Sequence, residues 1–311
     1  VNALFDSMQS IAITLVLVLG LIILVISVLY SGQVVMPMKE VAGSIAMISS
    51  GDFNETMQIT GYSEAEDISD KFNSMLSVLQ NLEDARQEFV SNVSHELKTP
   101  ITSVKVLAES LIGQENVPVE LYQEFMVDIN EELERMNKII NDLLTLVKMD
   151  KNASEVNISE VNINEFLEAI LKQLQPIADK RNIEMIFESV RSVTAQVDEV
   201  KLAMAFRNLI ENAIKYNYDN GWVRVSLNAD HKFFYLKVSD SGVGIPEELQ
   251  DSIFERFYRV DKARSRETGG NGLGLAITRN AILLHRGSIK VHSIEQQGTT
   301  FAVRIPLMYS E

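Results

Sequence analysis

"SNVSHELKTPITS" (residues 91–103) is a helical stretch that places an ionisable pair, His95 and Glu96, one turn before a proline. Val93 and Leu97 belong to an apolar stripe at helical spacing. His95 lies two residues from each of them, which turns it by about 200° at about 100° per residue. We therefore predict that His95 faces away from the packed stripe and toward solvent.

The residues around Pro100 indicate how an exposed histidine could be used. Proline lacks the N–H that would bond the carbonyl of Glu96, so the helix should bend just below His95 and provide a hinge. Glu96 can accept or orient an imidazole proton, which makes the free ring nitrogen a better nucleophile. Thr99 lies one turn below His95 and could position a water molecule. Taken alone, this arrangement is weak evidence for a phosphoacceptor.

Apolar residues recur at spacings of three, four or seven on both sides of this stretch and predict two long helices. The first series contains Phe72, Leu76, Leu79, Leu82, Phe89, Val93, Leu97, Ile101, Val104, Ala108 and Leu111. The second series, after a break at 113–118, contains Leu121, Phe125, Ile129, Leu133, Met136, Ile140, Leu143 and Val147. Two such helices form a hairpin over residues 85–150, and two hairpins are expected to pair into a four-helix dimer.

Residues 11–30, "IAITLVLVLGLIILVISVLY", contain no charge and predict a transmembrane helix over 11–33. Twenty helical residues rise roughly 30 Å, the thickness of the hydrocarbon core of a bilayer. A signal peptide is the alternative, but it would have a shorter apolar core behind basic residues, and Asp6 precedes this one. Because the chain begins at Val1, we expect a piece of a longer protein, with 1–10 as a short extracytoplasmic remnant.

The segment 34–84 resembles a HAMP signal-relay domain, in which two short amphipathic helices flank an extended connector. The marks that carry this resemblance are Pro37, Gly51-Asp52, Glu66 and "FNSM" (72–75). Pro37 suits the first turn of a new helix, and a second helix should start near Ser63, where the spacing to Glu66 fits a capping box. Ser69 stands where glycine is common in HAMP domains. An ordinary amphipathic linker is the alternative.

The composition of the 311 residues excludes several classes of protein. The net charge is −15 and the pI is near 4.8, which argues against nucleic acid as a partner because phosphate contacts need a basic surface. The chain has no cysteine, so disulfides and cysteine-based zinc sites are absent. An apolar content of 46% is enough for a real core, and the length is too great for one ordinary domain.

Residues 151–311 have the pattern of an α/β sandwich. "WVRVSLNA" (222–229) and "FFYLKVSD" (233–240) alternate as strands do, and helical patterns cover 164–181, 198–216 and 273–286. Two glycine-bearing stretches, "VSDSGVGIP" and "GGNGLGLAI", permit positive φ and close approach of the backbone to a ligand. Neither stretch is a P-loop or a Rossmann turn.

Asn208 and Asn212 lie four residues apart in "FRNLIENAIKYN" (206–217) and share one helix face. Asparagine carbonyls are hard oxygen ligands of the kind that Mg²⁺ accepts while it binds phosphate oxygens. Two surface asparagines without a function are the alternative.

Five stretches together resemble the conserved boxes of the sensor histidine kinases of two-component systems. In chain order they are "SHELKTP", "NLIENAIKY", "DSGVGIP", "IFERFYR" and "GGNGLGLAI". With the span and the HAMP-like segment, this resemblance covers nearly the whole chain. It implies a transmembrane helix, HAMP-like helices, an α-helical hairpin that forms a dimeric four-helix bundle, and an α/β sandwich that binds ATP over 151–311.

The resemblance also implies roles for individual residues. His95 is similar to the phosphorylated histidine, Glu96 to the acidic residue that assists proton removal, and Thr99 to a residue tied to phosphatase activity. Arg259 is similar to an arginine that reaches the γ-phosphate, and Asn212 to the Mg²⁺ ligand. The other nucleotide-binding positions that it implies are Asn208, Lys215, Tyr216, Asp240, Gly242, Gly244, Ile245, Phe257, Gly270, Gly272, Leu273, Gly274 and Thr299.

The function that the resemblance implies is phosphorylation of His95 from ATP and Mg²⁺, followed by transfer to an aspartate of a response regulator. The expected protein is a homodimer in the cell membrane with its catalytic part in the cytoplasm. An ATPase or chaperone with the same nucleotide fold is one alternative, although it would use a carboxylate where Asn208 stands. A pseudokinase scaffold is another alternative, but the intact His95, Asn212 and glycines argue against it.

Overall fold

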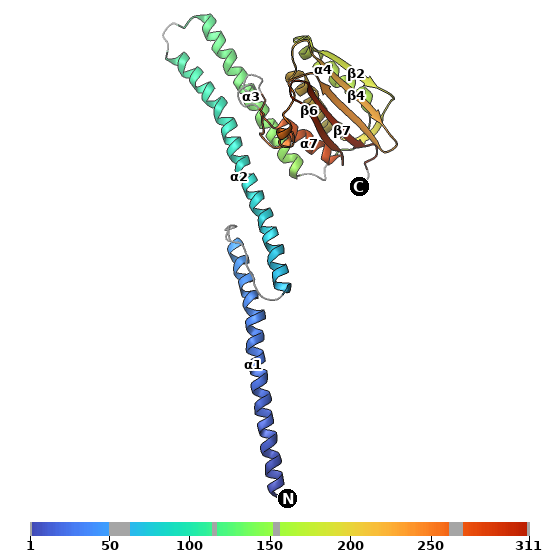
Figure 1. Cartoon of the computed structure of the whole chain (residues 1–311). Coiled ribbons are helices and arrows are strands. Elements are labelled where there is room, and N and C mark those ends of the chain that lie inside the picture. Colours follow the sequence, from blue (N-terminus) through green and yellow to red (C-terminus); the bar gives the residue numbers. More distant parts are fainter. Residues whose placement is uncertain (1, 50–62, 114–116, 152–155, 261–269, 310–311) are drawn as a thin grey trace. The chain divides into compact units, whose positions relative to one another are not determined.

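The fold is taken from a computed structural model, which describes residues 2–49, 63–113, 117–151, 156–260 and 270–309 (Figure 1). The chain forms two compact units, Val1–Val90 and Ser91–Glu311.

The first helix, α1 (Asn2–Ser49), contains the apolar segment Ser7–Ser31. This segment has a mean hydropathy of 3.2, and its length and composition suffice to cross a membrane. α1 continues through Pro37, so the prediction of a new helix starting at that proline is wrong. A proline costs a helix one donor and a local clash, and the helix-forming residues on both sides continue the ladder past it. The predicted turn at Gly51-Asp52 lies outside the described residues.

The second helix, α2 (Ser63–Ile112), begins at the residue that the capping-box spacing indicates and ends at the predicted break. The backbone N–H of Gly113 still donates to the carbonyl of Glu109 at 3.0 Å. α2 runs through Pro100 without interruption, and Pro100 itself is buried. α3 (Val119–Lys151) follows. The bend predicted at the proline stays a prediction.

The apolar seam expected along α3 only partly matches the buried face. Ile139 and Leu146 are almost fully buried at 1% and 0% exposure. Leu133, Ile140 and Val147, which the seam includes, are 46%, 40% and 50% exposed. These three residues are spaced by exact sevens, so they form a second apolar stripe that the described residues of this single chain leave open.

The C-terminal part is a five-stranded sheet in the order β2-β4-β5-β7-β6, with a separate antiparallel pair of β1 and β3. β2 pairs with β4 in parallel, and the other neighbours are antiparallel. The strands are β1 (Ser159–Asn162), β2 (Glu184–Ser189), β3 (Thr194–Val197), β4 (Trp222–Ala229), β5 (Phe233–Asp240), β6 (Ser288–Ile294) and β7 (Gly298–Pro306). β4 and β5 have the predicted bounds, so the alternation in their sequences was a correct signal.

Three helices cover one face of this sheet and build the core with it. They are α4 (Ile163–Asp179), α5 (Glu199–Lys215) and α7 (Gly274–Leu284). On β4, Val223 and Val225 are fully buried, whereas Trp222 and Arg224 between and beside them stay exposed. The sheet therefore has one packed and one open face.

Both ends of α5 are held by hydrogen bonds that include side chains distant in the sequence, His285 at the start and Arg181 at the end. At its start, Asp198 accepts a hydrogen bond from the backbone N–H of Lys201 at 3.0 Å, and the Asp198 N–H donates to His285 Nε2 at 2.8 Å. At its end, the Arg181 guanidinium donates to the carbonyls of Ile214, Lys215 and Asn217 at 2.8, 2.9 and 2.7 Å. These contacts satisfy backbone N–H groups at the start of α5 and carbonyls at its end, and they hold α5 in position for the site.

Candidate active site

A pocket of about 510 Å³ opens between α3, α5, the segment after β5 and the start of α7. Most of the nucleotide-binding residues expected from the sequence line it: Asn208, Asn212, Lys215, Tyr216, Asp240, Gly244, Ile245, Arg259, Gly270, Gly272, Gly274 and Thr299. Gly242, Phe257 and Leu273 are not among its lining residues, and neither are His95, Glu96 and Thr99. The structure thus brings together segments that lie more than a hundred residues apart in the sequence, from α3 to the start of α7 and beyond.

One end of the pocket contains a buried carboxylate. Asp240 ends β5 and is 7% exposed. Its Oδ1 accepts hydrogen bonds from the backbone N–H groups of Gly242 at 2.9 Å and Thr299 at 3.2 Å. Burial raises the pKa of Asp240 to about 6, and the two hydrogen bonds oppose that rise. Because both hydrogen bonds reach Oδ1, the second oxygen remains for a donor in the pocket.

Two glycines shape the backbone around this site. Gly244 has a φ of +71°, and a Cβ there would lie 2.1 Å from the carbonyl oxygen of Ile294. Gly272 has a φ of +70°, and a Cβ there would lie 2.7 Å from the backbone of Phe257. Phe257 donates its N–H to the Gly272 carbonyl at 2.9 Å. Side chains at either position would displace the pocket wall, which explains why both are glycine.

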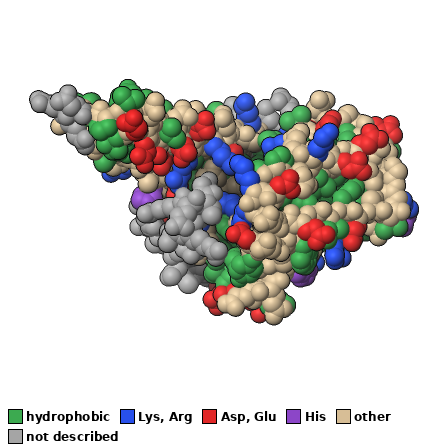
Figure 2. Space-filling view, turned by 90° about the horizontal axis from the view of Figure 1, so that it is seen from above, with side chains coloured by type: hydrophobic (Ala, Val, Ile, Leu, Met, Phe, Trp, Pro, Cys, Tyr) green, Lys and Arg blue, Asp and Glu red, His purple; other side chains and the backbone are tan. Residues whose placement is uncertain are grey.

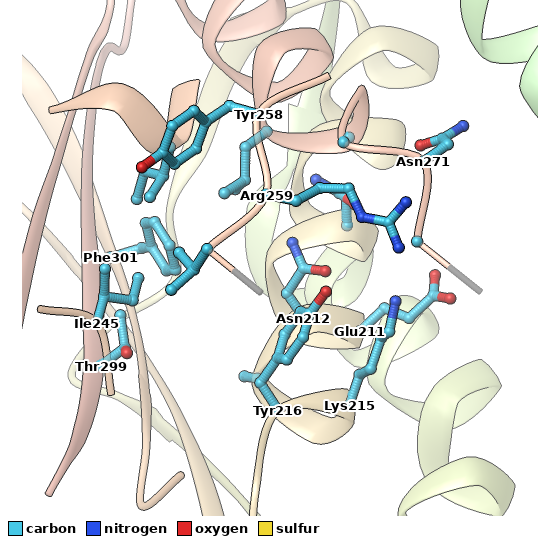
Figure 3. A pocket seen from close by; sticks show the side chains of 18 of the residues that line it. Glu211, Asn212, Lys215, Tyr216, Ile245, Tyr258, Arg259, Asn271, Thr299 and Phe301 are labelled. Carbon is cyan, nitrogen blue, oxygen red and sulfur yellow. The ribbon is translucent and has the colours of Figure 1, made fainter. Parts of the chain in front are cut away.

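Basic side chains gather at the other end of the pocket. Figure 3 shows the Arg259 guanidinium and the Lys215 amine projecting toward the same region, near Asn212 and Glu211. Burial, together with the positive charge of Lys138, lowers the pKa of Lys215 to about 8. Figure 2 shows a group of Lys and Arg side chains near the middle of one face, with acidic side chains on either side. A positive region in a chain of net charge −15 favours an anionic ligand.

Arg259 carries buried donors that no protein group satisfies. Its side chain is 10% exposed, and its Nη1 lies 3.7 Å from Glu96 Oε2. Its Nε and Nη2 find no hydrogen-bond partner among the described residues. Buried guanidinium donors are costly when unpaired, and this pair of donors fits an anion bound in the pocket.

His95 is exposed on α2, which confirms the prediction that it faces outward. Glu96, its neighbour in sequence, is 21% exposed and is the residue that Arg259 contacts. The Thr99 hydroxyl donates to the carbonyl of His95 at 3.2 Å. An arginine that lines the pocket is therefore in contact with the residue next to the exposed histidine.

Two family models match these same regions. The His Kinase A (phospho-acceptor) domain matches residues 85–152, and the histidine kinase-, DNA gyrase B- and HSP90-like ATPase domain matches residues 197–308. The sensor protein kinase WalK of Staphylococcus epidermidis is 36% identical over 281 residues, which cover 89% of this chain and 44% of that protein. The chain belongs to the sensor histidine kinases of two-component systems. It spans less than half of the length of that relative.

Two further proteins are similar to this sensor histidine kinase. The sensor protein kinase WalK of Staphylococcus aureus is 37% identical over 276 residues, which cover 86% of this chain and 64% of that one. The crystal structure of histidine kinase ThkA in complex with response regulator protein TrrA matches 73% of this chain and 64% of that chain. Its TM-score is 0.57 at 24% sequence identity, so the two proteins share a fold.

The structure of this histidine kinase also contains pocket residues that sequence reasoning missed. On α3, Asp142 accepts a hydrogen bond from Asn271 at 2.6 Å, and Lys138 lies 3.8 Å from Glu211. Both α3 residues line the pocket. The partners in the hydrogen bond are 129 residues apart, and no local pattern in the sequence signals such a contact.

Asn208 also has a structural role, which the sequence did not indicate. Its amide nitrogen donates to the Thr278 hydroxyl at 2.9 Å, and a Cβ on Gly274 would lie 2.4 Å from its oxygen. Asn208 thereby joins α5 to α7 while it lines the pocket.

Proposed function

We propose that this chain is a membrane-bound sensor histidine kinase that transfers the γ-phosphoryl group of ATP to His95. The observation that carries the proposal is the Arg259–Glu96 contact, because it joins the anion-binding end of the pocket to the residue beside an exposed histidine. In this proposal, residues 11–33 span the membrane, 34–84 form a HAMP-like relay, 85–150 dimerise and carry His95, and 151–311 bind ATP.

The pocket fits ATP in size and in chemistry. A volume of about 510 Å³ lies within the range of small-molecule sites, roughly 300–1,000 Å³. The ionised Asp240 would accept a hydrogen bond from the adenine amino group, with Thr299 and Ile245 at the same end. Lys215 and the unpaired donors of Arg259 would bind phosphate oxygens at the other end.

Asn212 would hold Mg²⁺ through its amide oxygen. The metal, when bound, neutralises charge on the phosphates. Asn212 lines the pocket on α5, and Figure 3 places its amide between the base end and the basic side chains. Phosphoryl transfer depends mainly on charge neutralisation and alignment, so the protein needs few other groups besides a nucleophile.

Glu96 would act on the imidazole of His95 by accepting its ring proton as the other ring nitrogen attacks phosphorus. Arg259 contacts Glu96 in the present structure and would exchange this partner for the γ-phosphate. Glu96 would then be released to serve His95.

We further propose that the phosphoryl group passes to an aspartate of a response regulator, and that Thr99 takes part in its removal. The ThkA–TrrA complex is a protein of the same fold bound to a response regulator. The exposed stripe of Leu133, Ile140 and Val147 supports a homodimer, because its seven-residue spacing suits a second helix pair. The segment Ser7–Ser31 supports a cell-membrane location, with the catalytic part in the cytoplasm beside ATP.

Incubation of the chain with γ-labelled ATP and Mg²⁺ separates this function from ATP hydrolysis. A histidine kinase acquires label on the protein that acid removes and base preserves. An ATPase releases labelled phosphate and leaves the protein unlabelled, and that result would contradict the proposal. Asn208 stands where a hydrolytic relative would need a carboxylate, and its amide is engaged with Thr278.

A further inference from the structure

We infer that Ser293 on β6 is a positioning residue that makes the base end of the pocket (Asp240, Ile245 and Thr299) selective for a purine with a 6-amino group. Ser293 is not among the residues that line this pocket, and it acts on the base through Thr299, which does line it. The inference rests on the proposed function for the identity of the ligand, a nucleoside triphosphate. It deepens that function because it concerns which base the pocket accepts.

The Ser293 hydroxyl has three hydrogen-bonding neighbours. It accepts from the backbone N–H of Ile245 at 2.7 Å, and it lies 2.9 Å from the carbonyl oxygen of Gly298. It also lies 2.9 Å from the hydroxyl oxygen of Thr299. A hydroxyl group has one proton to donate and two lone pairs that accept. These neighbours therefore use the full hydrogen-bonding capacity of Ser293.

The chemistry of the neighbours sets the direction of each hydrogen bond. The N–H of Ile245 can only donate and the carbonyl of Gly298 can only accept, so the hydroxyl proton of Ser293 goes to Gly298. One lone pair of Ser293 then remains, and the Thr299 hydroxyl donates its own proton to it. The Thr299 hydroxyl consequently has no proton for a ligand and offers only lone pairs.

The base end of the pocket thus presents acceptors. The Thr299 N–H donates to Asp240 Oδ1 at 3.2 Å, and the second carboxylate oxygen of Asp240 remains for a donor in the pocket. Both residues are 7% exposed, so water competes little for these oxygens. A 6-amino group brings donors to such a surface, whereas a 6-oxo group brings a further acceptor that would stay unpaired. We therefore expect ATP to bind and its 6-oxo counterpart, inosine triphosphate, to be rejected.

A second side chain holds the same backbone in place. Gln250 Nε2 donates to the carbonyls of Ile245 and Ser293 at 3.0 and 2.9 Å. Ile245 lines the pocket, and Figure 3 shows it beside Thr299. Ile245 is therefore tied at its N–H by the Ser293 hydroxyl and at its carbonyl by Gln250. These ties fix the segment after β5 against β6, so the Ser293 hydroxyl keeps its position next to Thr299.

Equilibrium binding of ATP, inosine triphosphate and tripolyphosphate, each with Mg²⁺, to the whole chain in detergent tests the inference. Ser293→Ala frees the Thr299 proton, which can then turn into the pocket and donate to a 6-oxo group. The dissociation constant of inosine triphosphate divided by that of ATP should fall by roughly 2- to 10-fold, the value of one hydrogen bond. Tripolyphosphate meets only the basic end of the pocket and should bind as it does to the parent.

Ser239→Ala is the matched control. Ser239 on β5 is half-buried like Ser293, and its hydroxyl accepts from the Thr300 hydroxyl at 2.9 Å. It pairs with Arg224 on the open face of the sheet, so this variant loses a similar Ser–Thr contact away from the pocket. It should keep the parent ratio of dissociation constants.

Two other substitutions of Ser293 separate the hydroxyl from the size of the side chain. Ser293→Thr keeps a hydroxyl and should keep the parent ratio. Ser293→Cys keeps the size, but sulfur is a weak hydrogen-bonding partner, so the ratio should fall as in Ser293→Ala. Ser293→Cys also carries the test if Ser293→Ala does not fold.

A double substitution shows whether Ser293 acts through Thr299. In a Thr299→Val chain no hydroxyl can turn toward the base, so adding Ser293→Ala should leave the ratio unchanged. A fall that persists in the Thr299→Val chain would overturn the inference. So would a parent ratio in Ser293→Ala, an equal fall in Ser239→Ala, or a loss of tripolyphosphate affinity in Ser293→Ala as large as its loss of ATP affinity.

The behaviour of the parent distinguishes this inference from the proposed function. A parent that binds ATP and inosine triphosphate equally well would overturn the inference and leave the kinase function intact. A parent that prefers ATP but acquires no label on His95 would contradict the kinase function and leave the role of Ser293 intact.

Discussion

Replacing Asp240 by asparagine should stabilise the nucleotide-binding domain and weaken its affinity for ATP at the same time. The pKa of Asp240 is raised from 3.8 to about 6. At about 1.4 kcal/mol per pKa unit, that rise corresponds to a loss of ~3 kcal/mol in the free energy of unfolding near neutral pH, where the buried carboxylate is ionised. An amide keeps an oxygen that can accept from Gly242 and Thr299, but it carries no charge to desolvate.

The sign of the pH dependence follows from the raised pKa. Because Asp240 binds its proton more tightly in the folded domain than in the unfolded chain, the destabilisation is fully present above about pH 6. It disappears as the pH falls through about 6 toward the unfolded value of 3.8. The stability gained by Asp240→Asn should therefore be large at pH 7.5 and about half as large at pH 5.

The affinity should change in the opposite direction. The carboxylate of Asp240 would accept a hydrogen bond from the adenine amino group. An asparagine side chain can instead present its NH2 group, which is a donor and cannot accept that hydrogen bond. A hydrogen bond to a charged group is worth about 1.5–3 kcal/mol, so the dissociation constant of ATP should rise roughly 10- to 150-fold. Trp222, the only tryptophan of the chain, is a suitable probe, because its carbonyl accepts from Ser241 next to Asp240.

The assay is thermal unfolding followed by Trp222 fluorescence, with and without ATP, in parent and variant. At pH 7.5 the variant should melt roughly 6–12 °C higher without ATP and gain less from added ATP. A variant that melts at or below the parent temperature would refute the account of the buried carboxylate. Unchanged ATP affinity would refute the role of Asp240 at the base.

Three further predictions follow from the same contacts. Arg259→Ala should slow labelling from ATP by about 10²–10³-fold, because the buried donors at the phosphate end are lost, and a rate equal to the parent would contradict this. Arg181→Ala should lower the free energy of unfolding by about 3 kcal/mol, because three carbonyls at the end of α5 lose their donor. Arg181→Lys should recover only part of that stability, as measured by thermal unfolding followed by Trp222 fluorescence. Raising the pH through about 8 should weaken ATP binding, measured at equilibrium, because Lys215 loses its charge. The Lys215→Arg variant stays charged and should not show this pH dependence. An equal loss of ATP affinity in the parent and the variant would count against a role for Lys215.

The sequence predicted the elements whose signals are local. The strands at 222–229 and 233–240 were found with their exact bounds because alternation of apolar and polar residues directly reports a sheet with one buried face. The start of α2 at Ser63 and its end before Gly113 were equally local, since a capping residue and a glycine mark helix termini in the sequence itself.

Errors arose where one signal had two structural outcomes. Pro37 fits the first turn of a helix, but a long helix can also absorb one proline in its interior, and α1 does so. The apolar residues of α3 occupy two stripes, and spacing alone does not say which stripe packs within the chain. Leu146 is buried, whereas Val147, the next residue, is 50% exposed and available to a second copy.

The candidate site was predictable in its composition but not in its connections. Asp240, Gly244, Gly272 and Asn212 could be picked out from the sequence because each belongs to a recognisable local motif. The structure places all four in the lining of one pocket. The Arg259–Glu96 and Asp142–Asn271 contacts join residues more than a hundred positions apart, and polar pairs at such distances leave no periodicity in a single sequence. Arg181 was missed for the same reason, because its partners are backbone carbonyls, which any sequence provides.

The most direct test of the central claim is the site of the label after a brief reaction with γ-labelled ATP, read by mass spectrometry at neutral pH. The account predicts phosphate on the imidazole of His95, with no label in a His95→Gln chain that still binds ATP as tightly as the parent. Label on any other residue, or labelling of the His95→Gln chain at the parent rate, would contradict it.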